Sequence, residues 1–595
     1  MKKMTMVMLM ASMMGATACS SEDPINDLYN EMDNFGGGGM AGGMGSATAG
    51  SGELTTFTIA LDKTTAEPSS VADEYFPDEE DLLENNEFTT EVNIDLSNPT
   101  ASTENGVEIT VNGGHITANH GSTKKICYVV SGKTENGSFT VVGDKKYEVK
   151  LNGVDITNPD SAALNLLSGK RAYIVLADGT TNKLADGTTS QNNHKGALYC
   201  KGKLLFNGNG ALEVYGNYAN AIHTADYIVF RKGNNIYANS TIKNGIKAND
   251  GVFINGGIIN VEVSAAGAKG INCEDDIIIN GGRTTVVATG NGAWDSDDQE
   301  TKAAAGIKAD SIITINAGEV YLKATGSGGK GLKADWEAYI NGGKLRVITE
   351  GGLYYSNGSS ENHNYTGNTD NLNDDYTSSP KGIKVGTKNV HGVLDITGGD
   401  IMVRTKGTNG EGIESKGTLT ITDGSVMVAA YDDAINSSSD LTISGGNVVA
   451  VGINNDGLDT NGNLYIKGGT LIAMGAGGAE TGIDIDEQHK LYITGGNIFG
   501  IGGRVDGSIG STSQGIATTS GSVAANATVT VSNGSTTLAS FTMPPYSYNN
   551  GTIMVSAPGM SSGNSYTLKL GSTSQSITAS NSINSSMGGG PGGRR

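Results

Sequence analysis

Short runs of alternating apolar and polar residues recur through the middle of the chain, and each run is bounded by glycine. The repeated phrase is Gly-Ile or Gly-Leu, one variable residue, one small residue, a strand that ends near Gly-Gly, and a second apolar strand. In one copy, residues 245–248 lead to 252–257 and then to 258–263. Alternation with a period of two predicts half-buried β-strands and excludes a repeat built from helices.

The variable residue of each phrase forms a column when the copies are aligned. Most steps along this column are between 22 and 25 residues long, and the longer steps indicate loops inserted at one corner. A nearly fixed period with two or three short strands is typical of a solenoid, in which stacked units share one core. We predict that this column points outward. Its members are Asn165, Tyr199, His223, Lys247, Asn272, Lys308, Lys333, Lys384, Glu414, Asn436, Asp459 and Asp484.

The next residue of each phrase is small or apolar, so we predict that it points into the core. Cys200 and Cys273 belong to this second column and lie three rungs apart, which is about 14 Å at about 4.8 Å per rung. A disulfide requires Cα atoms within about 7 Å of each other, so we expect two free thiols. The second column is Leu166, Cys200, Thr224, Ala248, Cys273, Ala309, Ala334, Val385, Ser415, Ser437, Thr460 and Ile485.

Asparagine also recurs just before or within the glycine turns. Asparagine tolerates left-handed backbone and caps turns, so stacked copies are expected to be structural. These residues are Asn112, Asn152, Asn207, Asn255, Asn280, Asn316 and Asn341.

Composition and charge narrow the class of protein. The 595 residues include 89 Gly, about twice the usual share, but only 10 Pro, which does not fit collagen or wholesale disorder. The net charge of −22 argues against a nucleic-acid partner, which requires basic stripes. An acidic surface instead suits a secreted protein and divalent cations. We expect a monomer.

The N-terminus has the pattern of an export signal. Residues 1–18 combine a positive start, a short apolar run and small residues before Cys19, which predicts a signal peptide with lipidation of that cysteine. Residues 20–23, Ser-Ser-Glu-Asp, are similar to the acidic tag of Bacteroidetes surface lipoproteins. Residues 19–52 then read as a Gly-rich tether. The expected location is the outer membrane, exposed on the cell surface, with the membrane contacted only through the lipid.

The repeat pattern divides residues 53–595 into a predicted solenoid, a C-terminal β region and a tail. Residues 53–520 are predicted to form the solenoid, with an acidic cap or insertion at 62–91 and a loop insertion at 350–380. Residues 521–582 break the repeat and read as a small C-terminal β region. Residues 583–595 form a Gly-rich tail that we expect to be disordered.

Acidic residues dominate the outward positions of the last third of the solenoid. Basic neighbours are few there, so stacked carboxylates would repel one another without counter-charges. Carboxylate and carbonyl oxygens from adjacent rungs suit Ca²⁺, whereas few Cys and scattered His argue against zinc. The alternative is a solvated acidic face that aids solubility. The predicted metal ligands are Glu411, Glu414, Asp432, Asp433, Asp456, Asp459, Asp484 and Asp486.

The middle third carries lysines in the outward column, with aromatic residues nearby. These lysines could bind a polymer of uronic acid, or Asp310 and Asp335 could neutralise them from the same strand face. Aromatic rings matter because the apolar faces of sugars stack on them. The predicted ligand-binding side chains are Lys308, Lys333, Lys384, Trp336, Tyr354 and Tyr355.

Several phrases together resemble a family of bacterial carbohydrate-binding β-helix proteins whose founding member comes from a cellulose-degrading clostridium. They are residues 195–208, the Gly-Ile-Lys-Ala steps, Gly-Leu-Asp-Thr-Asn-Gly at 457–462 and the Gly-Gly strand ends. The resemblance covers roughly residues 53–582. It implies a right-handed parallel β-helix like that of polysaccharide lyases, bound Ca²⁺, and binding of polygalacturonate or cellulose. The acidic phrases around Glu411 and Asp456 match the acidic repeat of this family.

We therefore expect a non-catalytic protein that binds an acidic plant polysaccharide with the help of Ca²⁺. One alternative is a Ca²⁺-dependent polysaccharide lyase, in which the metal acidifies the uronate α-proton and a lysine of lowered pKa, such as Lys384, removes it. Another alternative is an adhesin without a glycan ligand. The sequence contains no phosphate loop of the Walker type.

Overall fold

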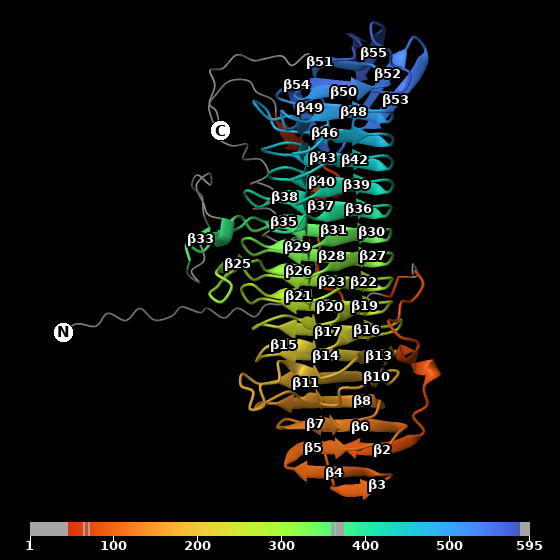
Figure 1. The fold of residues 1–595 in the computed structure, drawn as a ribbon, viewed down its shortest axis with the longest axis vertical. Helices are drawn as coiled ribbons and strands as arrows, with labels where there is room; N and C mark the ends of the chain where they lie inside the picture. The colour runs from red at the N-terminus through yellow and green to blue at the C-terminus, as the bar shows by residue number, and fades with distance from the viewer. Residues whose placement is uncertain (1–45, 64–65, 69–71, 359–362, 365–373, 584–595) are drawn as a thin grey trace, which may run out of the picture. The chain divides into compact units, whose positions relative to one another are not determined.

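The computed structural model describes residues 46–63, 66–68, 72–358, 363–364 and 374–583. This part of the chain is almost entirely β-strand, and most strands belong to two long sheets with parallel pairing, as Figure 1 shows. The predicted all-β class is therefore confirmed. None of the helices in these ranges has the length and apolar character needed to cross a membrane.

The strands fall into three parallel rows, and the chain visits the first, second and third row in turn before it returns to the first. The first row is β10 (Ala172–Leu176), β13 (Leu204–Gly208), β16 (Tyr227–Phe230), β19 (Gly251–Ile254), β22 (Ile277–Ile279), β27 (Ile312–Ile315), β30 (Glu337–Ile340), β36 (Val393–Ile396), β39 (Thr418–Ile421), β42 (Leu441–Ile443), β45 (Leu464–Ile466) and β48 (Lys490–Ile493). The second row is β11 (Thr181–Asp186), β14 (Ala211–Gly216), β17 (Asn235–Ser240), β20 (Ile258–Val263), β23 (Arg283–Ala288), β28 (Glu319–Ala324), β31 (Lys344–Thr349), β37 (Asp400–Thr405), β40 (Ser425–Ala430), β43 (Asn447–Gly452), β46 (Thr470–Met474) and β49 (Asn497–Gly502). The third row is β7 (Gly137–Val142), β9 (Leu164–Leu166), β12 (Gly196–Cys200), β15 (Asn220–Thr224), β18 (Ile246–Ala248), β21 (Lys269–Cys273), β26 (Ala305–Ala309), β29 (Lys330–Ala334), β35 (Lys381–Val385), β38 (Glu411–Ser415), β41 (Ile435–Ser437), β44 (Leu458–Thr460) and β47 (Ile483–Ile485).

One long strand joins the first two rows near their beginning. β8 (Tyr147–Asn158) pairs in parallel with both β10 and β11, so the first and second rows belong to one sheet. The third row belongs to a separate sheet that also contains β3 (Ser102–Glu104), β4 (Val107–Asn112) and β5 (Gly114–Asn119). We call one strand from each row, in chain order, a rung.

The Gly-Gly pairs turn the chain from the first row into the second. The second glycine of such a pair adopts positive φ, for example 85° at Gly257 and 76° at Gly343. A Cβ atom added at Gly257 would lie 2.7 Å from the backbone oxygen of Asn234 in the turn of the preceding rung. Residues other than glycine are disfavoured in this conformation and at this spacing, which explains why the pair recurs in the sequence.

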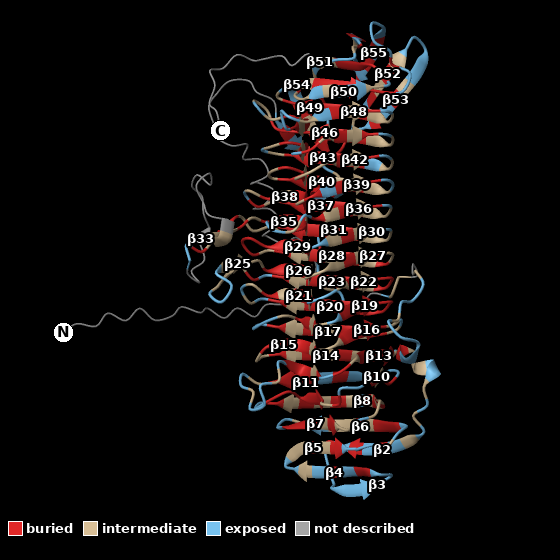
Figure 2. Cartoon of the chain, viewed as in Figure 1, coloured by how far each residue is buried: buried red, intermediate tan, exposed pale blue. Residues whose placement is uncertain are grey.

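The core consists of the inward-facing residues of the three rows. Every member of the predicted inward column is buried, and Figure 2 shows that buried residues concentrate on the stacked strands. Rings also stack from rung to rung, as Phe206 and Phe230 do with centroids 5.1 Å apart. The predicted direction of this column is confirmed, because each strand buries alternate residues against its neighbours above and below.

The two cysteines of the inward column are free thiols, as predicted. Burial raises the pKa of both Cys200 and Cys273 to about 12. Since the thiolate is the reactive form, we expect neither thiol to react with a thiol reagent in the native protein and both to react after unfolding. Peptide mapping by mass spectrometry checks this, and a peptide that links Cys200 to Cys273 would contradict the observed register.

The predicted asparagine stack forms over four consecutive rungs. The side-chain amide of Asn280 donates to Asn255, that of Asn316 donates to Asn280, and that of Asn341 donates to Asn316, at 2.9, 2.8 and 2.8 Å. Thr397 continues the line by donating its hydroxyl to Asn341. Asn112 and Asn152 are exposed and lie outside this ladder.

Residues 72–91 form a segment that we call the strap, which lies along the outer face of the first row. It contains two short 3-10 helices, η1 (Glu79–Asp81) and η2 (Leu83–Asn85). Its apolar side chains pack on a cluster of outward-facing residues from β10 to β19, which comprises Tyr173, Leu205, Tyr227, Val229 and Phe253. The strap thus covers an apolar part of the first row that would otherwise face water.

Antiparallel strands occur at both ends of the stack. At the beginning, the antiparallel pairs β3–β4 and β4–β5 precede β7, whereas β2 pairs in parallel with β6 and β5 pairs in parallel with β7. At the other end, β54 pairs with β49, β51 and β1, and four strands form a separate antiparallel sheet. The elements at the beginning are β2 (Thr90–Asp95), β3 (Ser102–Glu104), β4 (Val107–Asn112), β5 (Gly114–Asn119) and β6 (Ile126–Thr134). Those at the other end are β1 (Ala47–Ala49), α2 (Glu53–Thr56), β50 (Ser508–Thr512), β51 (Ile516–Val523), β52 (Thr528–Asn533), β53 (Thr536–Thr542), β54 (Tyr546–Ser556), β55 (Ser565–Leu570) and β56 (Thr573–Thr578).

Two insertions leave the stack between the second and third rows. One is the hairpin of β24 (Ala293–Asp295) and β25 (Glu300–Lys302). The other is the predicted loop insertion, of which the described part holds β32 (Tyr354–Tyr355), β33 (His363–Asn364), η3 (Asp374–Tyr376) and β34 (Thr377–Ser378). The C-terminal sheet and residues of β1 and α2 cover the apolar outer face of β37 to β49 in the second row.

Candidate functional site

The outward column of the third row has the predicted register. Each member pairs with the next across adjacent strands, from Asn165 beside Tyr199 to Asp459 beside Asp484. The steps of 36 and 51 residues also cross a single rung, because they bring Asn272 beside Lys308 and Lys333 beside Lys384. The column is therefore one continuous line of side chains that changes from basic to acidic along the stack.

Carboxylates neutralise the lysines in the middle of this column. The Lys308 ammonium lies 3.1 Å from Asp335 and also contacts Asp310, and the Lys333 ammonium lies 3.0 Å from Asp335. Burial lowers the pKa of Lys308 although Asp335 opposes this effect. Two interpretations of these lysines were open: binding of a uronate, or neutralisation by Asp310 and Asp335. The structure shows the ion pairs that the second interpretation requires.

Lys330, just before Lys333, holds the large insertion in place. Its buried ammonium donates to the hydroxyl of Ser378 at 3.0 Å and to the backbone oxygens of Gly328 and Ser379. Burial, with help from the neighbouring ammonium groups, lowers the pKa of Lys330 well below its usual value. A buried charge of this kind marks a structural contact as readily as a functional one.

The change of sign occurs between β35 and β38. Lys384 lies 3.1 Å from Glu414, and Lys381 contacts Glu411 and lies 3.6 Å from Glu414. Lys416, just after β38, adds a contact of 2.6 Å to Glu414. Despite burial, these three ammonium groups hold the pKa of Glu414 well below its usual value. Two of the predicted metal ligands, Glu411 and Glu414, are thus engaged by lysines.

The next rungs carry carboxylates without such partners. Asp433, Asp456 and Asp459 form no ion pair with lysine or arginine within the described residues. Their contacts are hydrogen bonds: Asp456 N–H donates to Asp433 at 3.0 Å, and the Asn436 amide donates to Asp459 at 3.1 Å and to Asp433 at 3.4 Å. We call Asp433, Asn436, Asp456 and Asp459 the acidic segment.

Burial and mutual repulsion make the ionised form of these carboxylates unfavourable. Burial and the carboxylates around it raise the pKa of Asp433 to about 9. Burial and neighbouring carboxylates, chiefly that of Asp484, raise the pKa of Asp456 to about 8 and that of Asp459 to about 7. A cation placed among them would relieve both the repulsion and the loss of hydration.

The other predicted metal ligands lie at the margins of this segment. Asp432 accepts a hydrogen bond of 2.9 Å from the Asn455 amide. Asp484 is half-buried, and burial raises its pKa, with Asp506 adding to the effect. Asp486 is exposed and accepts from the backbone N–H of Gln488.

The donor set of the acidic segment fits a hard cation in its chemistry. Carboxylate and amide oxygens from successive rungs are the ligands that Ca²⁺ takes, and they do not suit zinc. Within the ranges that the structure covers, no three His, Cys, Asp or Glu side chains converge closely enough to enclose a metal ion. The segment therefore supplies oxygen atoms, but the described side chains do not form a closed metal-binding group.

The predicted aromatic residues differ in exposure. Trp336 is 57% exposed, whereas Tyr354 is fully buried and offers no ring face to a ligand. Tyr355 is half-buried on the same insertion. Trp294 and Tyr376, from the two insertions, contact each other with ring centroids 5.1 Å apart, which fastens one insertion to the other.

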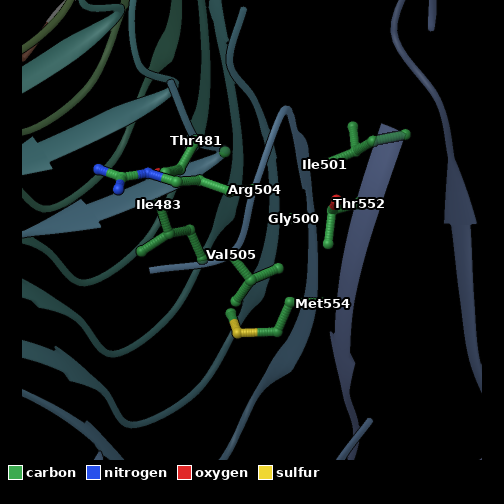
Figure 3. Close-up of a pocket in the computed structure, with 9 residues that line it drawn as sticks. Thr481, Ile483, Gly500, Ile501, Arg504, Val505, Thr552 and Met554 are labelled. Atoms are coloured by element: carbon green, nitrogen blue, oxygen red, sulfur yellow. The ribbon is translucent and has the colours of Figure 1, made fainter. Parts of the chain in front are cut away.

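A small cavity lies beside the last rungs, and Figure 3 shows Ile483, Val505 and Met554 among its lining residues. Its volume is about 10 Å³. This is close to the space for a single water molecule, so the cavity cannot hold a sugar.

The predictions about export lie outside the described residues. They concern the signal peptide, lipidation of Cys19, most of the tether, and nearly all of the Gly-rich tail. They stay predictions.

Parallel rows of short strands with a charged line of side chains on one row define a β-rich repeat protein. A family model described as carbohydrate-binding domain-containing protein matches residues 112–267 and 235–452. The two matches together span more than half of the chain, and the protein belongs to this family.

Two individual proteins are similar to parts of the chain. A carbohydrate-binding domain-containing protein of Acetivibrio thermocellus is 32% identical over 120 residues, which are 19% of this chain and 42% of that relative. The match thus spans less than half of the relative's length. A solved structure, titled the polysaccharide lyase-like protein from C. thermocellum, gadolinium derivative, has 22% identity, a TM-score of 0.31, and coverage of 44% of this chain and 91% of that chain.

The raised pKa values of the acidic segment predict how stability depends on pH in the absence of divalent cations. Asp433, Asp456 and Asp459 stay protonated in the folded protein up to about pH 7 to 9 but ionise near the usual aspartate pKa of 3.8 when unfolded. The folded state therefore binds more protons in this window, so stability falls as pH rises and levels off above about pH 9. Thermal melts in EDTA check this, and D433N should flatten the slope. Equal slopes in the wild type and D433N would contradict it.

Proposed function

We propose that this protein binds an acidic plant polysaccharide, of the polygalacturonate type, along its third row, with a divalent cation such as Ca²⁺ held by the acidic segment. The observation that carries the proposal is the set of buried carboxylates without a cationic partner. Asp433 and Asp456 are 5% and 6% exposed, and among the described residues their printed contacts are with an amide, backbone N–H groups and other carboxylates. Buried carboxylates of this kind either bind protons, as their raised pKa values indicate in the absence of divalent cations, or take a counter-ion.

The cation would link the protein to the sugar. The carboxylates of Asp433, Asp456 and Asp459 would hold the cation, and the amide oxygen of Asn436 would be an uncharged ligand. The cation would supply the positive charge that a uronate carboxylate requires. A polyanion alone would be repelled by this segment, since the whole chain carries a net charge of −22. Ion pairs already occupy the lysines of the middle column, so they add less to uronate binding than the acidic segment does.

The third row is the part of the stack best placed for a long ligand. The strap covers apolar residues of the first row, and the C-terminal sheet covers apolar residues of the second row. The outward residues Asn436, Asp459 and Asp484 of the third row remain half-exposed on successive rungs. Trp336, which follows the third-row strand β29, supplies an exposed ring on which a sugar could stack.

Two further parts of the proposal concern the handedness of the fold and the cellular location of the protein. The three rows would wind as a right-handed parallel β-helix, because connections between parallel strands are right-handed in about 98% of cases. Lipidation of Cys19 would anchor the protein at the cell surface, where polysaccharide is encountered. A stack of short rungs gives a rigid face on which a polymer can lie.

Affinity electrophoresis tests the proposed function. The protein should be retarded in gels that contain polygalacturonate and CaCl₂, and EDTA should abolish this effect. Highly methyl-esterified pectin is the matched control, because esterification removes the sugar charge and keeps the backbone. Equal retardation in EDTA, or by the ester, would overturn the cation-linked mechanism. Absence of retardation by every glycan would favour an adhesin, and a growing absorbance of unsaturated uronate would show a lyase.

A further inference from the structure

The outward side chains of the third row change from lysine on β35 to glutamate on β38, and the contacts between these two strands suggest why the acidic part begins there. Two side chains, three residues apart, come from each of two adjacent third-row strands: Lys381 and Lys384 from β35, and Glu411 and Glu414 from β38. The pair at the same spacing before and in β44 is Asp456 and Asp459. The carboxylate pairs of β38 and β44 are therefore alike in position, but only the first has lysines beside it.

Lys381 and Lys384, with Lys416 as a third ammonium group on Glu414, neutralise the carboxylate pair of β38. Each ammonium group carries one positive charge, so Lys381 and Lys384 together match the charge of Glu411 and Glu414, as a single divalent cation would. Their contacts are buried: the side chains of Lys381 and Glu414 are 7% and 3% exposed. The Lys381 ammonium reaches both carboxylates, which is the bridging role of a bound cation.

The β38 pair retains an unused acceptor. The Oε2 atom of Glu411 is buried and accepts no hydrogen bond from any described residue, even with the lysines in place. An ammonium donates only along its three N–H directions, whereas a metal ion can be approached by both oxygens of a carboxylate. The lysines thus balance the charge of this pair without satisfying all of its oxygen atoms.

We infer that Lys381 and Lys384 are built-in counter-ions that occupy a latent cation site at Glu411 and Glu414 and so set the end of the cation-binding segment. The inference rests on the proposed function, because it takes the acidic segment as a cation site. It excludes Glu411 and Glu414 from the cation ligands of the native protein. It also assigns a role to lysines that would otherwise be read as uronate-binding groups.

The double substitution K381M/K384M tests this inference. Methionine keeps most of the side-chain volume but removes both charges, so the carboxylate pair of β38 should then take a divalent cation. Calorimetric titration with CaCl₂ should show one additional bound ion per chain. Thermal melts should show a lower Tm than wild type in EDTA and a larger rise in Tm on addition of CaCl₂.

Two further variants keep the test decisive. K381M/K384M/E411Q/E414Q removes the carboxylates as well and should return to the wild-type number of ions. If the double variant does not fold in EDTA, K381M alone removes the ammonium group that reaches both carboxylates, leaves Lys384 and Lys416 on Glu414, and should still show a larger Ca²⁺-dependent rise in Tm than wild type. K323M/K344M, with the same charge loss on the second row, should show no gain.

The outcomes separate this inference from the proposed function. If wild type binds Ca²⁺ and neither lysine variant gains binding or Ca²⁺-dependent stability, the built-in counter-ion is refuted and the acidic segment stands. If wild type binds no Ca²⁺ and the lysine variants gain an ion, the latent site stands and the proposed function fails. A gain in the K323M/K344M control equal to that in K381M/K384M would also refute the inference.

Discussion

D433N/D456N/D459N should lose Ca²⁺ binding and become more stable than wild type in EDTA. Each asparagine keeps an oxygen acceptor for the hydrogen bonds seen at these positions but removes a buried negative charge. We expect affinity for Ca²⁺ to fall by roughly 100-fold or more, because ligand charge sets the affinity of such sites. At about pH 9, where these carboxylates ionise, removal of the repulsion should raise the Tm in EDTA by several degrees, since repelling buried carboxylates destabilise the folded state.

The two effects have opposite signs, which distinguishes a ligand site from a structural one. Calorimetric titration and thermal melts, each with CaCl₂ and with EDTA, measure them. D395N is the control, because Asp395 is a half-buried carboxylate on the outer face of the first row. A triple variant that is less stable than wild type in EDTA would contradict the prediction, because it would show that these carboxylates hold the fold together.

D81A should detach the strap and lower stability by about 3 to 5 kcal/mol, as expected when one partner of a buried ion pair is removed. The Asp81 side chain is fully buried, and it accepts hydrogen bonds from the Arg171 guanidinium at 2.8 Å and from the Tyr227 hydroxyl at 2.7 Å. Its loss leaves both donors without that acceptor. Because these residues connect the strap to two different rungs, the apolar cluster beneath the strap should become exposed.

Hydrogen exchange measured by mass spectrometry checks the location of this effect. Residues 72–91 and the first-row strands β10 to β19 should exchange faster, while β40 to β49 should keep their protection. E79A, an exposed change in the same short helix, should behave like wild type. Protection of the strap in D81A equal to that in wild type would mean that its apolar contacts alone hold it.

The register of the third row could be predicted from the sequence because a local signal fixes it. The Gly-Ile or Gly-Leu step marks the same place in every rung, and the period of two then decides which residues face inward. For this reason Cys200 and Cys273 are buried free thiols, and Lys384 lies beside Glu414 although 30 residues separate them. The contact between those two residues follows from the column itself.

The strap and the insertions could not be placed in this way. The contact between Asp81 and Arg171 joins segments 90 residues apart, and no periodic signal relates them. Likewise, an aromatic residue on an insertion can face solvent or fold back. Tyr354 is buried in the structure, whereas Trp336 in a turn of the repeat is exposed. The sequence located these residues near the third row but could not decide which ring was available to a ligand.

The most direct test of the central claim is a calorimetric titration in two stages on one sample. Wild-type protein freed of divalent cations is titrated first with CaCl₂ and then with a galacturonate oligomer. We predict a saturable Ca²⁺ signal in the first stage, a saturable oligomer signal in the second, and no oligomer signal when the first stage is replaced by EDTA. Oligomer binding of the same strength in EDTA, or none in either case, would contradict cation-linked binding of an acidic polysaccharide.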